Sequence, residues 1–273
     1  MDNGNTVLRI GAIVAARMSS RRLPGKPLRP VAGKPLLQYL LERLERSRCL
    51  EGVVVATSTA PSDDAIQRFC EAAGVECQRP SPSDAAGRCR DVLDRSGFDA
   101  FLRVEADAPL LDPRLVEHAV GLYREHATRA AGADLVTNTH PPTFPGGQSV
   151  EIVAAAAFRR AEPRIRTPGD REDVTRWFYR HAGEWRIVSF TAAGDWSDVQ
   201  LAVDTPGDLV RFREVIGRMA RPQWTYGWRE AIALQRGLEG PPSPHQRPAP
   251  GASVGEPAER AATQERGATA AGN

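Results

Sequence analysis

The chain has 273 residues, a hydrophobic fraction of 41% and a formal net charge of +2, which is enough apolar material for one substantial α/β core. A charge so close to balance, with aromatic residues at only 6%, argues against a nucleic-acid binder. Apolar runs stay below the roughly 20 residues of a membrane span, and the first ten residues lack the order of a signal peptide, so we expect a cytoplasmic protein without membrane contacts.

The first half of the chain alternates between strand-like and helix-like patterns. The expected strands cover residues 8–16, 53–57, 75–79, 100–104 and 134–138, and the expected helices cover residues 35–46, 63–73, 84–95 and 113–126. Such alternation is typical of a doubly wound, mostly parallel sheet. The sequence therefore predicts an α/β fold.

The second half is less regular. Strands are expected at residues 149–153, 186–190 and 200–203, and helices at 171–181 and 207–219. An excursion inserted at about residues 140–190 of a single domain, 1–239, would account for the looser order. Residues 240–273 are rich in Pro, Gly, Ala and charge, and we expect them to form a disordered tail.

A basic loop follows the first expected strand, in the run IVAARMSSRRLPGKPL at residues 13–28. In open α/β sheets, nucleotides and phosphates bind at the carboxyl ends of the strands. Small residues in the loop allow backbone N–H groups to approach phosphate oxygens, while Arg and Lys supply positive charge. The pattern favours an anion site over a solvated basic turn. The cations of the loop are Arg17, Arg21, Arg22 and Lys26.

Two carboxylates follow other expected strands. Asp107 lies in RVEADAPLLDP and Asp204 in LAVDTPGDL, so the parallel-sheet model places both at the same edge as the basic loop. Two oxygen ligands beside a phosphate site suit Mg²⁺, which takes one or two carboxylates and completes its shell with water and phosphates. Alternatively, Asp204 is a helix N-cap and Asp107 is a turn residue before Pro109.

The ordered motifs ARMSSRRLPGKPL, VVVATS, RVEADAPLLDP, REDVT and LAVDTPGDL extend over most of the chain. In this order they resemble the cytidylyltransferase family of CMP-KDO and acylneuraminate synthetases, and most closely its SpsF-like branch of spore-coat polysaccharide biosynthesis. The resemblance implies a Rossmann-like nucleotidyltransferase domain that forms a homodimer, with the excursion supplying dimerisation and acceptor contacts. It also implies transfer of CMP from CTP to an acceptor, with release of pyrophosphate.

The same resemblance assigns roles to individual residues. It implies that Asp107 and Asp204 bind Mg²⁺, and that Arg17 and Lys26 stabilise the charge that develops on the phosphates. With Asp107, these two cations are the expected catalytic residues. The residues expected to bind the nucleotide are Ala15, Arg17, Ser20, Arg22, Lys26, Thr57 and Arg88, with Ala15 and Thr57 acting through their backbone near the base.

The acceptor side departs from the family pattern. Where the family has a DGLDVE-like segment this chain has GGQSVE, the REHVT-like element reads REDVT, and Glu105–Ala106 replaces Thr–Gly. The loss of carboxylates from the first segment predicts an anionic acceptor, either a sugar acid or a phosphonate or phosphorylated small acid. The residues expected to bind it are Gln148, Glu151, Arg171 and Glu172.

The motifs also bear on three alternatives to a cytidylyltransferase. A nucleotide-binding, non-catalytic relative that acts as a regulatory or partner subunit remains possible, although the main charged residues are all present. A glycosyltransferase is disfavoured because Asp107-Ala108-Pro109 is not a DxD motif, and Pro27 after Lys26 excludes a Walker A loop.

Overall fold

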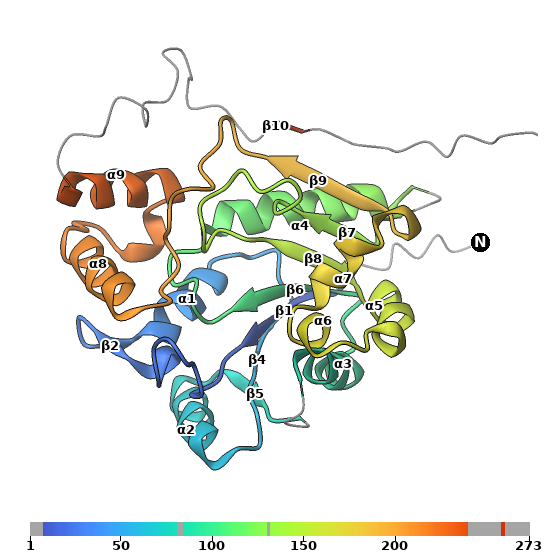
Figure 1. The fold of residues 1–273 in the computed structure, drawn as a ribbon, viewed down its shortest axis with the longest axis horizontal. Helices are drawn as coiled ribbons and strands as arrows, with labels where there is room; N and C mark the ends of the chain where they lie inside the picture. The colour runs from blue at the N-terminus through green and yellow to red at the C-terminus, as the bar shows by residue number, and fades with distance from the viewer. Residues whose placement is uncertain (1–7, 81–83, 130–131, 240–257, 260–273) are drawn as a thin grey trace, which may run out of the picture.

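A computed structural model describes residues 8–80, 84–129, 132–239 and 258–259 (Figure 1). The expected tail at 240–273 therefore lies outside the described residues, apart from two residues. The main sheet has the strand order β10-β9-β7-β8-β6-β1-β4-β5. Its strands are β1 (Ile10–Ala15), β4 (Val53–Ala56), β5 (Glu76–Gln78), β6 (Ala100–Glu105), β7 (Leu135–Thr137), β8 (Glu151–Ala154), β9 (Ile187–Thr191) and β10 (Ala258–Glu259).

The sheet is mostly parallel, as the sequence predicts. β1 pairs in parallel with β4 and with β6, β4 pairs in parallel with β5, and β7 pairs in parallel with β9. The apolar strands are buried on both faces, because helices cover a sheet of this kind. In β1, Ala15 pairs with Ala56 on one side and Glu105 on the other, so three strands end together.

β8 is an exception, because it runs antiparallel to both of its neighbours, β6 and β7. Its first residue, Glu151, pairs with Arg103 in β6 and with Thr137 in β7. The antiparallel direction thus brings the start of β8 to the edge where β6 ends. Strand direction cannot be derived from a hydrophobic pattern, so this arrangement was not predicted.

Helices flank the sheet, with α8 and α9 together at one side in Figure 1 and α3, α5, α6 and α7 at the other. No helix in the described part of the chain is long and apolar enough to cross a membrane. The helices are α1 (Leu36–Leu44), α2 (Asp64–Ala73), α3 (Ala85–Ser96), α4 (Pro113–Ala127), α5 (Ala155–Ala161), α6 (Pro168–Glu172), α7 (Val174–Arg180), α8 (Pro206–Gly217) and α9 (Trp228–Glu239).

Several expected elements differ from the structure. Residues 200–203 form no strand; only Gln200 makes an isolated bridge, to Gly146. The helix expected at 171–181 is interrupted at Asp173, whose φ of −119° and ψ of 80° are not helical. The sequence analysis also missed α5, α9 and the small hairpin of β2 (Pro30–Val31) and β3 (Lys34–Pro35).

The C-terminal part of the domain is attached through a buried arginine on α1. The Arg43 side chain, 1% exposed, donates to Gln223 Oε1 at 2.6 Å and to the carbonyl oxygen of Gln223 at 2.5 Å. It also donates to the carbonyl oxygens of Tyr226 at 3.0 Å and Leu111 at 3.4 Å. All four acceptors are neutral, and burial lowers the pKa of Arg43 to about 10. One side chain therefore joins α1, the turn before α4 and the segment before α9.

Candidate active site

A cleft of about 640 Å³, including space open to solvent, lies at the carboxyl ends of β1 and β6. This edge is where ligands bind in open α/β sheets. The start of α3 and the end of α6 close its sides. Its lining residues are Ala15, Ala16, Arg17, Ser19, Ser20, Lys26, Pro27, Ala85, Arg88, Glu105, Ala106, Asp107 and Glu172.

The basic loop is folded back by a glycine turn. Gly25 adopts a left-handed conformation, with φ of 71°, and its N–H donates to the carbonyl oxygen of Met18 at 2.9 Å. Asp63 holds the other side of the loop by accepting from the Met18 N–H at 2.8 Å. A residue with a Cβ is strained at such a φ, and the turn brings the short 3₁₀ helix Lys26–Leu28 against the cleft.

Lys26 joins the two predicted metal ligands. Its Nζ lies 2.9 Å from Asp107 Oδ2 and 3.1 Å from Asp204 Oδ1. Arg22 pairs with the same oxygen of Asp204 at 2.9 Å, and the N–H of Val203 donates to the carbonyl oxygen of Asp107 at 2.8 Å. The structure thus brings together three residues that are far apart in the sequence, at the expected edge of the sheet.

Asp204 is not the N-cap of α8. Thr205 is the cap, and it forms a capping box with Asp208, whose Oδ2 accepts from the N–H groups of Thr205 at 2.8 Å and Asp204 at 3.1 Å. Since Asp208 accepts the hydrogen bonds of the N–H groups at the start of the helix, the carboxylate of Asp204 is available to the cleft. The alternative assignment of Asp204 as a simple cap is therefore wrong.

The pair of carboxylates fits a magnesium ion. Asp107 and Asp204 each direct one oxygen to the ammonium group of Lys26, and their side chains are 25% and 16% exposed. Among the described residues there is no group of three or more potential metal-binding side chains. This donor set matches Mg²⁺, which prefers oxygen and needs few protein ligands when phosphates and water supply the rest.

Arg88 is the most unusual side chain of the cleft. It is 2% exposed, and its Nε and Nη1 have no hydrogen-bond partner among the residues that the structure describes. Burial, and then repulsion from Arg17, lower the pKa of Arg88. Arg17 itself pairs with Glu172 at 2.7 Å. A buried guanidinium with unused donors is costly unless a ligand supplies acceptors, so Arg88 indicates an anionic or oxygen-rich ligand.

The remaining residues expected to bind the nucleotide differ in their placement. Ala15 and Ser20 line the cleft. Arg22 contacts Asp204 at its edge, whereas Thr57 is fully buried at the end of β4 and is not among the lining residues. The backbone N–H of Thr57 donates to the carbonyl oxygen of Gln78 and so extends the sheet, while Thr57 Oγ1 is buried without a hydrogen-bond partner among the described residues.

Two residues expected to bind the acceptor instead make hydrogen bonds and ion pairs within the fold. Gln148 is fully buried, and its amide accepts from the N–H of Asp112 at 2.9 Å and donates to the carbonyl oxygen of Leu110 at 2.8 Å. Arg171 pairs with Asp84 and Glu162, each at 2.8 Å, away from the cleft lining. Their placement does not match the acceptor role predicted for them. Among the expected acceptor residues, only Glu172 lines the cleft.

The fourth, Glu151, belongs to what we call the Arg103 cluster: Arg103, Glu105, Glu151 and Asp173. Arg103 lies 2.7 Å from Glu105, 3.1 Å from Glu151 and 3.5 Å from Asp173. Tyr179 donates to Glu151 at 2.5 Å. Burial and crowding by Asp107 and Asp173, opposed by Arg103, raise the pKa of Glu105, which connects this cluster to the cleft.

Arg103 and Tyr179 were not among the site residues predicted from the sequence. The charge of Arg103 within the apolar strand β6 was a usable signal, because an arginine in a buried strand needs nearby carboxylates. Residues two apart on a strand share a face, so a pair between Arg103 and Glu105 could have been predicted. Tyr179 offered no such signal, since its contact with Glu151 depends on the antiparallel direction of β8.

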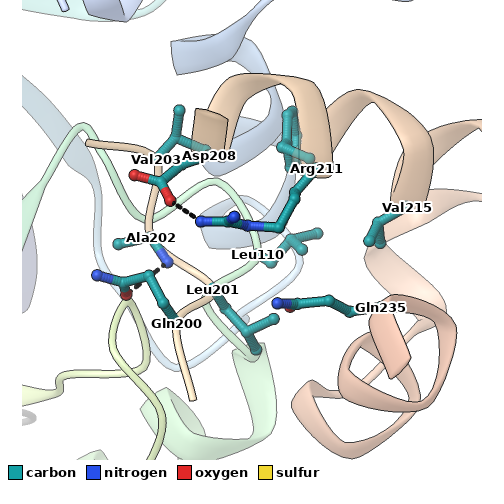
Figure 2. Close-up of a pocket in the computed structure, with 10 residues that line it drawn as sticks. Leu110, Gln200, Leu201, Ala202, Val203, Asp208, Arg211, Val215 and Gln235 are labelled. Carbon is teal, nitrogen blue, oxygen red and sulfur yellow. Dashed lines mark hydrogen bonds and ion pairs between the residues drawn. The ribbon is translucent and has the colours of Figure 1, made fainter. Parts of the chain in front are cut away.

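A second, shallow cavity, of about 260 Å³ including space open to solvent, lies beside residues 200–203. Figure 2 shows Asp208 and Arg211 paired at one end of it and Gln235 directed toward it from α9. Leu110, Leu201 and Val215 contribute apolar lining. This cavity contains none of the residues predicted to bind a ligand, and it separates α8 and α9 from the segment that leads to Asp204.

Comparisons with known proteins agree with this geometry. Residues 11–151, just over half of the chain, match the sequence profile of a family described as cytidylyltransferase. The 8-amino-3,8-dideoxy-manno-octulosonate cytidylyltransferase of Shewanella woodyi is 30% identical over 215 residues, which cover 76% of this chain and 85% of that protein. The enzyme of the same name from Shewanella baltica is 33% identical over 124 residues, 44% of this chain and 49% of that protein.

Solved structures show the same fold. A cytidylyltransferase from Leptospira borgpetersenii superposes with a TM-score of 0.79 at 25% identity, covering 85% of this chain and 95% of that chain. A CMP:2-keto-3-deoxy-manno-octonic acid synthetase, solved with CTP, gives a TM-score of 0.58 at 20% identity over 77% of this chain and 99% of that one. The fold is that of the α/β nucleotidyltransferases. The chain belongs to the cytidylyltransferase family.

Proposed function

We propose that this protein transfers CMP from CTP to a sugar acid and releases pyrophosphate. The convergence of Lys26, Asp107 and Asp204 in one cleft is the observation on which the proposal depends. Two relatives named for octulosonate cytidylyltransferase activity support the choice of a sugar acid. A non-catalytic relative would not need to keep these three groups in contact, so we favour the enzyme.

In the proposed reaction, the triphosphate lies against the basic loop. The acceptor oxygen attacks the α-phosphorus and the bond to the pyrophosphate oxygen breaks, so negative charge grows on the phosphate oxygens. Lys26 and Arg17 are placed to stabilise that charge, and Arg88 offers two donor nitrogens, Nε and Nη1, that have no partner among the described residues. Asp107 and Asp204 would hold Mg²⁺, which when bound supplies further positive charge to the phosphates.

Binding of CTP is tested by differential scanning with each nucleoside triphosphate and Mg²⁺. We expect CTP at 100 times its Kd to stabilise the protein by about 2.7 kcal/mol, and pyrophosphate to be released when a sugar acid is added. The absence of stabilisation by any triphosphate at millimolar concentration would contradict the proposal. Size-exclusion chromatography with light scattering tests our further expectation, which depends on the family resemblance, that the enzyme is a homodimer.

Replacement of Arg88 should separate folding from ligand binding. We expect Arg88→Met to leave the free protein as stable as the wild type or more stable, because an apolar side chain of similar length removes a buried guanidinium, two of whose nitrogens have no hydrogen-bond partner in the described part of the chain. The same variant should lose most of its stabilisation by CTP. Thermal unfolding with and without CTP measures both effects, and an Arg88→Met protein that still responds fully to CTP would show that Arg88 does not contact the nucleotide.

A further inference from the structure

A buried carboxylate outside the cleft supports the basic loop. Asp63 is 1% exposed and is not among the residues that line the cleft. Its Oδ1 accepts from the N–H of Met18 at 2.8 Å. That N–H belongs to the planar peptide group between Arg17 and Met18, so the hydrogen bond fixes the orientation of this group. Arg17 and Ser19, on either side of Met18, both line the cleft.

The second oxygen of Asp63 binds the segment that follows the neighbouring strand. Oδ2 accepts from the N–H of Ser58 at 3.2 Å and from the Ser58 hydroxyl at 2.5 Å. Ser58 comes two residues after β4, which pairs in parallel with β1. The carboxylate therefore links the segments that leave two adjacent strands, and three donors compensate for its burial.

Arg79 holds the turn that contains Asp63. Its Nε donates to the carbonyl oxygen of Ser58 at 2.8 Å, and its Nη2 donates to that of Ala60 at 3.1 Å. The same side chain, directly after β5, pairs with Asp64 at the start of α2 at 2.6 Å. Because one guanidinium binds three groups of the turn, we expect the position of Asp63 to be fixed independently of the basic loop.

A capping role does not explain Asp63. It stands at the N-cap position of α2, but its side chain accepts no hydrogen bond from that helix. Asp84 and Asp112 hold the same position before α3 and α4, and both of their side chains cap the helix. Aspartate is favoured before a helix because it caps the free N–H groups there. The carboxylate of Asp63 binds the basic loop instead.

We propose that Asp63 is a positioning residue for the triphosphate. By fixing the peptide group between Arg17 and Met18, it keeps the basic loop ordered against the cleft before the nucleotide binds. The conformational entropy of ordering the loop is then not lost again during binding. The inference rests on the proposed function, and it assigns a role to a residue that lies outside the lining of the cleft.

The size of the effect depends on the fraction of free molecules in which the loop is ordered. The apparent Kd equals the intrinsic Kd divided by this fraction, so a fall to about one tenth raises the Kd about tenfold. Contacts of the bound phosphates with Arg17 and Lys26 restore the loop once CTP is present. The loss should therefore appear in Kd and KM and leave kcat almost unchanged.

Asp63→Ala tests the inference by calorimetric titration with CTP and Mg²⁺, at a temperature at which urea unfolding shows the variant to be folded. We expect the Kd for CTP to rise about tenfold or more and kcat to stay within about threefold of the wild type. The Kd for CMP, which lacks the two outer phosphates, should rise less. Asp63→Asn keeps an oxygen for the Met18 N–H and should recover most of the affinity for CTP.

Asp134→Ala is the matched control. Asp134 is 7% exposed and accepts from the N–H of Arg186 at 3.0 Å. It directly precedes β7, and the directions of β6, β7 and β8 place the start of β7 at the edge of the sheet opposite the cleft. This variant should lose stability, because a buried donor loses its acceptor, and it should keep the wild-type Kd for CTP.

A wild-type Kd in Asp63→Ala, an equal loss for CMP and CTP, or no recovery in Asp63→Asn would overturn the inference while leaving the proposed function in place. If Asp63→Ala does not fold, hydrogen exchange of the free wild type decides. Protection of the Met18 N–H supports the inference, and exchange at the rate of an unfolded chain overturns it. Failure of CTP to stabilise the wild type, with no pyrophosphate from any sugar acid, would overturn the proposed function and the inference together.

Discussion

Asp107→Asn should lower kcat by about 10²–10³-fold while the protein stays folded, because a neutral amide is a poor replacement for a carboxylate that holds a metal beside phosphates. The variant keeps the contact between Lys26 and Asp204, so the loss of stability should be about 1 kcal/mol or less. Pyrophosphate release over a range of Mg²⁺ concentrations measures the effect, and more Mg²⁺ should be needed for half-maximal activity. We expect the same pattern for Asp204→Asn.

The control for this experiment is Asp94→Asn, which removes an exposed carboxylate that pairs with Arg159 on the outside of α3. It should change neither kcat nor the Mg²⁺ dependence. An Asp107→Asn protein that keeps more than a tenth of the wild-type kcat would show that Asp107 is not needed for the chemical step, and the assigned roles in the cleft would have to be revised.

Arg43→Ala should destabilise the protein by about 3–5 kcal/mol, since it leaves four buried oxygen acceptors without their donor and creates a cavity beneath the C-terminal segment. The acceptors belong to Gln223, Tyr226 and Leu111. Urea unfolding gives the change in the free energy of unfolding. Arg43→Lys keeps the charge but has only one nitrogen, and it should recover part of the loss.

Arg46→Ala is the matched control, because Arg46 is exposed and lies 4.6 Å from the ring of Trp224, in the same region as Arg43. Its replacement should cost less than about 1 kcal/mol. A free energy of unfolding for Arg43→Ala within about 1 kcal/mol of the wild type would mean that these acceptors find water instead, and that Arg43 does not hold the C-terminal segment.

The nucleotide side of the cleft could be predicted from the sequence to a large extent. Parallel strands all present their carboxyl ends at one edge, so a cationic loop after the first strand and aspartates after later strands had to lie near one another. That rule led to Lys26 and Asp107, and the structure brings them into contact. Asp204 was placed there through a strand at residues 200–203 that does not form; its segment reaches the same edge through the hydrogen bond from the Val203 N–H to the carbonyl oxygen of Asp107. Their roles in binding CTP and Mg²⁺ stay predictions.

The acceptor side could not be predicted in the same way. Its geometry depends on the direction of β8 and on the break at Asp173, and neither follows from periodicity or local propensity. Gln148 was expected to bind the acceptor because of its motif, but it is buried and its amide bonds to the backbone of Leu110 and Asp112. An anionic acceptor was expected from the carboxylates that the motif lost, and its identity stays a prediction.

The insertion of β8 between β6 and β7 has a consequence for how this enzyme could diversify. Apart from Glu172, the cleft is lined by residues of the ranges 15–27 and 85–107, while Glu151 and Asp173 come from the later part of the chain and meet the first part at Arg103, and Tyr179 contacts Glu151. Substitutions at Glu151, Asp173 and Tyr179 leave Lys26, Asp107 and Asp204 in place, whereas exchange of residues 137–180 as a whole would also remove Glu172, the partner of Arg17.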